Sequence, residues 1–197
     1  PHGPLHCPQK YLDLYKDQLK GIAAFFGMIT NIDDNVGKTR ALLKELGQYE
    51  DTLFIFTTDN GTATGDKIFN AGMRGKKGSA YDGGHRVPFM AHWPKRGMNF
   101  HREIKTLTHA VDIVPTLLDY AEGSAPDGLK FDGRSLKPLF EGAAWPDRFL
   151  VTDSQRVRDP IKWKSSSVMS EEFRLINGKE LYHIDKDPGQ KEDVAKE

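Results

Sequence analysis

Residues 52–58 read TLFIFTT and are followed directly by Asp59-Asn60-Gly61. The first seven residues are β-branched, aromatic or leucine, and polar residues do not alternate with apolar ones. This pattern predicts a strand that is buried on both faces of a parallel sheet. Because ligands gather at the carboxyl ends of strands in α/β sheets, the polar residues that follow the strand are the first candidates for a site.

The segment before this strand predicts a long amphipathic helix. Apolar residues recur at three- and four-residue steps between Asp17 and Leu46, and Gly47 is placed to end the helix. A helix followed by a buried strand favours an α/β layer. Residues 1–16 are rich in Pro, His and Tyr and predict an extended lead-in.

The segment after the strand predicts a long loop and then further elements. Residues 60–86 contain seven glycines and scattered charges, which is typical of a functional loop. A second strand is expected at 87–93, and a helix capped by Asp112 is expected to continue to about Ala121. Residues 122–147 predict a linker, and short strands are expected at 149–152, 166–169, 173–176 and 180–184, with a hairpin turn at Asn177-Gly178.

The overall composition excludes two classes of function. The 28 basic residues balance 28 acidic ones, which argues against a basic nucleic-acid binder and against a polybasic membrane module. With 38% hydrophobic residues and no long apolar run, the chain is expected to form one soluble domain with a small appendage. Cys7 is the single cysteine and cannot form an internal disulfide.

Two segments carry residues suited to chemistry. Asp59 and Asn60 offer two hard oxygen donors for Ca²⁺ or Mg²⁺, although Asp-Asn-Gly is also ordinary turn composition. Lys76 and Lys77 lie in a glycine-rich loop that suits an anion, and a solvated basic loop is the alternative. The loop is not a Walker motif, since Gly78 separates Lys77 from the following serine.

Taken together, the sequence resembles the sulfatase family of the alkaline-phosphatase-like superfamily. The matching segments occur in family order: Pro1-His2-Gly3-Pro4 with Tyr11-Leu12, Thr58–Gly61, Gly75–Pro88, Asp112–Leu118 and Glu180–Gly189. The resemblance implies an α/β fold, part of a mixed or parallel sheet with flanking helices, and a small C-terminal antiparallel α+β subdomain. Residues 1–145 would belong to the α/β catalytic domain and residues 146–197 to the subdomain.

The resemblance also implies calcium-assisted hydrolysis of sulfate esters. Asp59 and Asn60 would be metal ligands, Lys77 would contact the sulfate or leaving-group oxygen, and His2 would contact the sulfate or assist the leaving group. His85 is a candidate for lining the substrate pocket, with a structural hydrogen bond as the equal alternative. We expect Arg86 to tie its loop down through carboxylates.

The sequence departs from the family pattern at the nucleophile. The family forms a formylglycine from the first residue of Cys/Ser-x-Pro/Ala-x-Arg, which these 197 residues do not contain, and two further metal-binding aspartates cannot be assigned. Asp33-Asp34 falls within the predicted helix and is interpreted as helix surface or a local polar contact. We therefore expect a C-terminal portion of a sulfatase that is inactive by itself, with the formylglycine in the missing N-terminal part.

Two alternatives remain open: a phosphonate or phosphate ester hydrolase of the same superfamily, and a non-catalytic binding module that keeps the fold. The expected partner is a sulfated small molecule or carbohydrate, and neither nucleic acid nor a membrane is expected. An exposed sheet edge predicts a tendency to self-associate, which light scattering would test. By resemblance, the full-length protein would be periplasmic or secreted, although this chain shows no signal sequence.

Overall fold

The computed structural model describes residues 1–99 and 101–196, and in it the predicted long helix forms as α2, Lys20–Glu45. The helix ends as expected. Gly47 has a φ of +68°, its N–H donates to Lys44 O at 3.0 Å, and the next N–H donates to Leu43 O at 2.9 Å.

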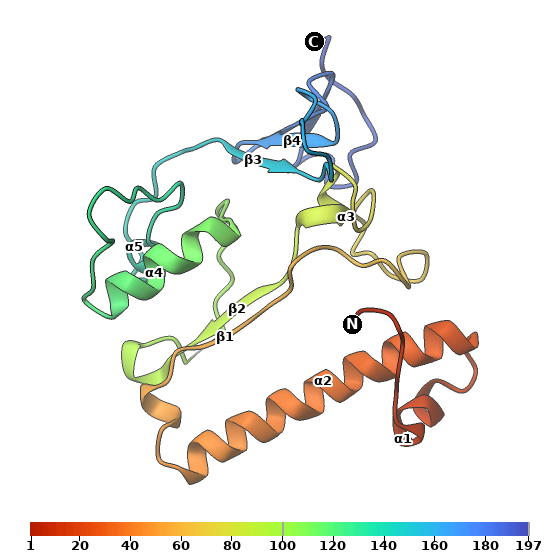
Figure 1. The fold of residues 1–197 in the computed structure, drawn as a ribbon, viewed down its shortest axis with the longest axis vertical. Coiled ribbons are helices and arrows are strands. Elements are labelled where there is room, and N and C mark those ends of the chain that lie inside the picture. Colours follow the sequence, from red (N-terminus) through yellow and green to blue (C-terminus); the bar gives the residue numbers. More distant parts are fainter. Residues whose placement is uncertain (100, 197) are drawn as a thin grey trace. The chain divides into compact units, whose positions relative to one another are not determined.

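The predicted extended lead-in is wrong, because part of it is helical. Helix α1, Gln9–Leu12, continues into a 3₁₀ turn at Asp13–Tyr15. Figure 1 shows α1 beside the first half of α2. Tyr11 is buried there and its hydroxyl donates to Asp34 Oδ2 at 2.7 Å. This contact joins residues far apart in the sequence, so local composition could not predict it.

Strand β1, Phe54–Thr57, lies inside the predicted strand and pairs with β2, Phe89–His92. The helices and strands together confirm the α/β class. The parallel, doubly buried arrangement is not found among the described residues: the two strands pair antiparallel, and residues 54–56 are half-buried. The connection, residues 58–88, holds turns and the short helix α3, Asp82–His85, but no long helix of the kind that usually links parallel strands.

The chain divides into two compact units, Pro1–Phe100 and His101–Glu197, called unit 1 and unit 2 below. Unit 1 holds α1 to α3 and the β1–β2 ladder, with 3₁₀ turns at Tyr49–Asp51 and Pro94–Arg96. The domain boundary expected at residue 145 stays a prediction. No helix in the described part of the chain is long and apolar enough to span a bilayer.

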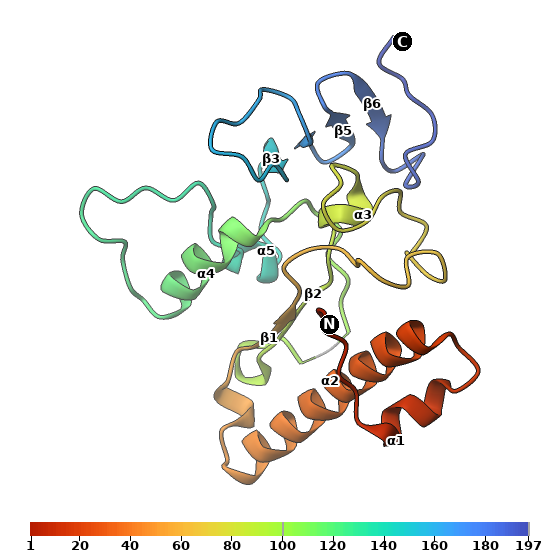
Figure 2. The same ribbon diagram turned by 45° about the vertical axis from the view of Figure 1, so that its right-hand side comes forward.

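Unit 2 contains the predicted small antiparallel sheet. Its strands are β3, Leu150–Asp153; β4, Ser166–Met169; β5, Phe173–Ile176; and β6, Glu180–His183, paired in that order. Figure 2 shows β5 and β6 side by side. Asn177 and Gly178, with φ of +54° and +66°, form the predicted hairpin turn between them.

The segment expected to be a linker is part of the core of unit 2. It contains helix α5, Lys137–Phe140, and Leu136 and Leu139 are both buried. The backbone N–H of Leu136 donates at 2.8 Å to Thr116 Oγ1 in helix α4, Ile113–Tyr120. Glycine, proline and aspartate mark the turns of this segment, but a few leucines are enough to anchor it.

Asp112 precedes helix α4 and also forms an ion pair with Arg148. Its side chain makes no capping bond to α4; it accepts hydrogen bonds from the backbone N–H of His109 at 2.8 Å and of Arg134 at 3.0 Å. The guanidinium of Arg148 donates to both carboxylate oxygens, and Asp112 is fully buried. The expected cap is therefore replaced by a buried ion pair that ties three segments of unit 2 together.

Candidate functional site

A cavity of roughly 1240 Å³ lies within unit 1, lined by residues of α2, β1 and β2, by the N-terminal segment and by the connection between the two strands. Phe25 and Ile29 of α2 and Phe56 of β1 contribute to an apolar wall. Four of the five predicted site residues line this one cavity: His2, Asp59, Asn60 and Lys77. The fold thus brings together residues that lie up to 75 positions apart, counting from 2 to 77.

Asp59 and Asn60 lie just beyond the end of β1. The strand register pairs Thr57 with Phe89, so this end of the ladder is where β2 begins. Asp59 is exposed and Asn60 is half-buried. The N–H of Gly61 donates to Gly84 O at 2.9 Å, which fixes the segment after the pair against the base of the glycine-rich loop.

The approach of these two backbones requires glycine at position 61, because a Cβ there would overlap Gly83 O. We expect Gly61→Ala to lower the free energy of unfolding by about 1–3 kcal/mol, the usual cost of overpacking. Gly37→Ala is the matched control: it faces open space within α2 and is expected to raise stability by about 0.5–1 kcal/mol. Urea unfolding measures both, and equal effects of the two would contradict the contact.

Lys77 is held beside the end of β1 by backbone hydrogen bonds. Its N–H donates to Thr62 O at 2.9 Å, and the Asn70 side-chain amide donates to Met73 O and Gly75 O at 2.8 Å each. Lys77 is half-buried, whereas the Nζ of exposed Lys76 lies 3.9 Å from Asp66 Oδ2. The structure therefore separates the two lysines: Lys77 lines the cavity and Lys76 makes a surface ion pair.

The two histidines lie in different surroundings. His2 is exposed at the cavity, with Nδ1 2.8 Å from Gly3 O. His85 is in α3 with Nε2 3.1 Å from Ala80 O, and it is not among the described residues that line the cavity. The contact of His85 matches the structural alternative, and the catalytic and substrate-binding roles of both residues stay predictions.

Arg86 contacts a carboxylate, as expected from the sequence. Its Nη1 lies 3.6 Å from Oδ2 of Asp82, which is fully buried at the start of α3. Arg86 also lines the cavity.

Asp33 is a cavity residue that the sequence interpretation did not identify. It lines the same cavity from α2, while its neighbour Asp34 accepts the hydrogen bond from the Tyr11 hydroxyl, 23 residues away in the sequence. A signal was present: Asp33 is four residues after Ile29 and three before Val36, and both of these line the cavity too. A carboxylate within an apolar helical stripe indicates a polar neighbour or ligand.

The other end of the ladder carries His92, which pairs with Phe54. Its Nε2 lies 3.3 Å from the hydroxyl of Tyr49, which accepts a hydrogen bond from Arg40 Nη2 at 2.6 Å. Burial, reinforced by the charge of Arg40, lowers the pKa of His92, so the ring is neutral at pH 7. His92 therefore adds no positive charge to the cavity at that pH.

Asp59 and Asn60 offer the type of ligand atom that a hard cation prefers, but two residues are too few to complete a site. A carboxylate and a neighbouring carboxamide are the oxygen ligands that Ca²⁺ prefers, but Ca²⁺ takes about six to eight of them. The described residues contain no group of three or more His, Cys, Asp or Glu side chains that could hold a metal ion. Asp59 and Asn60 would form one side of such a site.

Family comparisons agree with this arrangement of segments. The sulfatase family model matches residues 1–124, which include the whole cavity. The chain belongs to the sulfatase family. A second model, described as N-sulphoglucosamine sulphohydrolase, C-terminal, matches residues 75–197. The predicted family and fold are thereby confirmed.

The relatives that this chain matches are longer than the chain itself. An arylsulfatase of Clostridium perfringens is 33% identical over 75% of this chain and 37% of its own length. Human arylsulfatase A is 30% identical over 94% of this chain and 41% of its own. The solved structure of Ps i-CgsB in complex with k-i-k-neocarrahexaose superposes with a TM-score of 0.87 at 26% identity, over 100% of this sulfatase chain and 44% of that one. The chain thus spans less than half the length of these relatives.

Proposed function

We propose that this chain contributes His2, Asp59, Asn60 and Lys77 to the active site of a sulfuric ester hydrolase. The observation that supports the proposal is the convergence of these four residues on one cavity in a chain of the sulfatase family. A carboxylate, a carboxamide, an ammonium and an imidazole together suit an anionic ester whose leaving oxygen gains charge.

Each residue has a distinct task in this proposal. The half-buried ammonium of Lys77 hydrogen-bonds a sulfate or leaving-group oxygen and stabilises the charge that develops there. The exposed imidazole of His2 contacts the sulfate or donates a proton to the leaving oxygen. Asp59 and Asn60 would hold a Ca²⁺ ion, which when bound supplies positive charge next to the ester oxygens. The nucleophile is not assigned to any residue here, and we expect these 197 residues by themselves not to turn over sulfate esters.

A sulfated carbohydrate or small molecule is the proposed substrate. The support is the similarity to Ps i-CgsB, which was solved with neocarrahexaose, and to arylsulfatases. Secretion or a periplasmic location, and self-association through an exposed sheet edge, stay predictions of the sequence.

A phosphonate or phosphate ester is the second candidate. The phosphonate monoester hydrolase of Agrobacterium radiobacter has a TM-score of 0.63 at 31% identity, over 88% of this chain and 36% of its own. Hydrolysis rates of 4-nitrophenyl sulfate and 4-nitrophenyl phenylphosphonate, measured on the protein in its complete natural form, separate the two classes. Faster phosphonate hydrolysis would favour the second.

Removal of the cation tests the proposed metal ligands. We expect a chelator to abolish sulfate-ester hydrolysis by that complete protein and Ca²⁺ to restore it. Asp59→Asn should raise the Ca²⁺ concentration needed for half-maximal activity at least about tenfold, since one charged ligand is lost. Asp17→Asn, an exposed aspartate outside the cavity, is the control and should behave as the parent. A chelator without effect, together with an active Asp59→Asn variant, would favour a non-catalytic or metal-free role for this pair.

A further inference from the structure

A second hollow, the Trp163 groove, lies within unit 2 and has a volume of roughly 600 Å³. Two segments line it: residues 162–165, from the loop between β3 and β4, and residues 177–180, at the β5–β6 turn. None of the proposed catalytic or metal-binding residues belongs to this groove.

The indole of Trp163 is fixed against the hairpin turn. A Cβ on Gly178 would lie 2.8 Å from the indole Cγ, so the ring packs directly on the glycine backbone. Gly178 also has a φ of +66°, which favours glycine for a second reason. Trp163 is nevertheless 43% exposed, so a packed aromatic surface remains open to a ligand.

The groove is rich in positive charge that no described carboxylate neutralises. Lys162, Lys164 and Lys179 line it and are exposed, and none of them forms an ion pair with a described residue. The Nζ of Lys162 lies 5.1 Å from the centroid of the Trp163 ring. Glu180, the carboxylate among the described lining residues, accepts a hydrogen bond from the Tyr182 hydroxyl at 2.5 Å.

We propose that the Trp163 groove is a binding site for a sulfated saccharide. An aromatic face packs well against the C–H face of a sugar ring, and ammonium groups pair with sulfate as compact point charges. A full negative charge is also a stronger partner for Lys162 than the quadrupole of the indole ring, so sulfate binding would free that ring face.

This inference rests on the proposed function only for the choice of a sulfated ligand. Its test measures binding and not catalysis. Calorimetric titration of the full chain compares sulfated maltohexaose with unsulfated maltohexaose. The titrations use the Lys77→Ala variant, so that any binding of the sugar in the cavity of unit 1 is weakened. We expect the sulfated sugar to bind at least about tenfold more tightly than the unsulfated one, and its affinity to fall as salt is raised.

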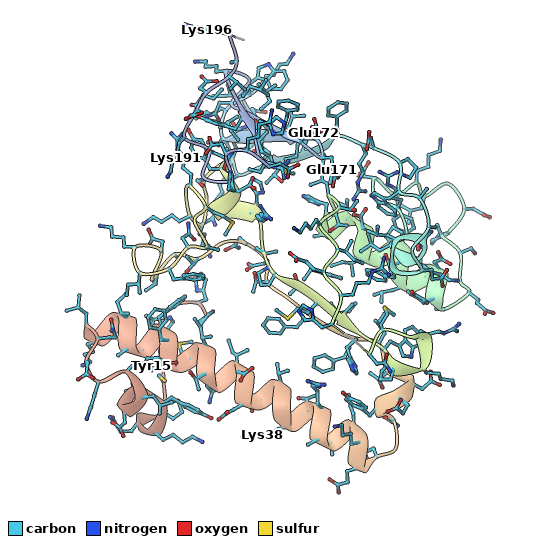
Figure 3. All side chains as sticks on the ribbon, turned by 180° about the vertical axis from the view of Figure 1, so that it is seen from behind. Tyr15, Lys38, Glu171, Glu172, Lys191 and Lys196 are labelled. Carbon is cyan, nitrogen blue, oxygen red and sulfur yellow. The ribbon has the colours of Figure 1, made fainter. Side chains whose placement is uncertain are left out.

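Substitutions within the groove identify the contacts. Trp163→Ala should weaken binding of the sulfated sugar about tenfold, and Trp163→Phe should restore part of it because an aromatic face returns. Lys162→Ala/Lys164→Ala should weaken it by a similar factor and reduce its salt dependence. The double variant Lys191→Ala/Lys196→Ala is the control, since it removes the same charge at two lysines outside the groove, labelled in Figure 3. It should change neither the affinity for the sulfated sugar nor the salt dependence of binding.

Several outcomes would overturn the proposal. Equal losses in the two double-lysine variants would indicate non-specific attraction of a polyanion. An unchanged affinity in Trp163→Ala, with its far-ultraviolet circular dichroism intact, would remove the aromatic contact. Binding of hexathymidylate as tight as that of the sulfated sugar would point to a nucleic-acid ligand.

Discussion

Replacing Asp112 with alanine is expected to lower the free energy of unfolding by about 3–5 kcal/mol, because it leaves the largely buried guanidinium of Arg148, 12% exposed, without its counter-charge. The carboxylate is fully buried and also accepts backbone hydrogen bonds from His109 and Arg134. All of these donors lose their acceptor at once.

Urea unfolding followed by tryptophan fluorescence measures this effect. Trp145 is a suitable reporter, since the guanidinium carbons of Arg134 and Arg148 lie 4.4 and 5.3 Å from its ring centroid. Asp119→Ala is the matched control: it breaks the part-exposed pair with Lys137 and should leave the midpoint nearly unchanged. Similar midpoints for the two variants would mean that the buried pair contributes no more than a surface one.

The same residue predicts a pH dependence of stability. Burial acts to raise the pKa of Asp112, but hydrogen bonds from Arg148 and from the backbone of Arg134 and His109 outweigh it and hold the pKa below its usual value. The stabilisation is therefore complete above the unfolded-state pKa of about 3.9 and is lost as the pH falls through the lower folded-state value. The difference in stability between the parent chain and Asp112→Ala should shrink only below about pH 4.

Lys77→Ala is expected to lower kcat for sulfate-ester hydrolysis about 10²–10³-fold, as is usual when one group that stabilises a developing oxyanion is removed. The expectation rests on the position of Lys77, half-buried at the cavity and held through its backbone to Thr62. The adjacent Lys76 carries the same charge but lies outside the described cavity lining, paired with Asp66.

Lys76→Ala is thus a closely matched control and should retain nearly full activity. Steady-state kinetics with 4-nitrophenyl sulfate, on the protein in its complete natural form, measure both variants. A large loss in Lys76→Ala with normal activity in Lys77→Ala would reverse the assignment of the two lysines. A rise in KM alone for Lys77→Ala would mean that the ammonium binds the substrate without assisting the reaction.

The elements that the sequence predicted are those with local causes. Helix α2 follows from its own apolar period, and the β5–β6 turn follows from Asn177-Gly178. Helix α1 was missed because it depends on Tyr11 meeting a residue of α2, and the buried leucines of residues 122–147 were missed because turn-forming residues surround them. The antiparallel pairing of β1 was missed because an apolar run reports burial and not strand direction.

In the candidate site too, residues with a local motif were predicted and residues defined by distant contacts were not. Asp59, Asn60, Lys77 and His2 carry motif signals, and the fold brings them to one cavity. Asp33 was set aside because it falls within a predicted helix, although its place in the apolar stripe of that helix was a signal. Asp112 was expected to cap a helix, and its ion-pair partner Arg148 is 36 residues away, a separation that no local pattern reveals.

Backbone hydrogen bonds at the base of the glycine-rich loop fix some of its residues and leave others exposed. Gly61 is bound to Gly84, and Lys77 to Thr62, so the loop is closed where the charged residues lie. Residues 63–73, with Phe69 76% exposed, extend beyond this closure. We expect substitutions of exposed Phe69 to leave Lys77 in place relative to Asn60, whereas Asn70, which donates to Met73 O and Gly75 O, is needed to hold the loop. In the proposed active site, we therefore expect substrate preference to vary at such exposed positions while the residues proposed for the chemistry stay fixed.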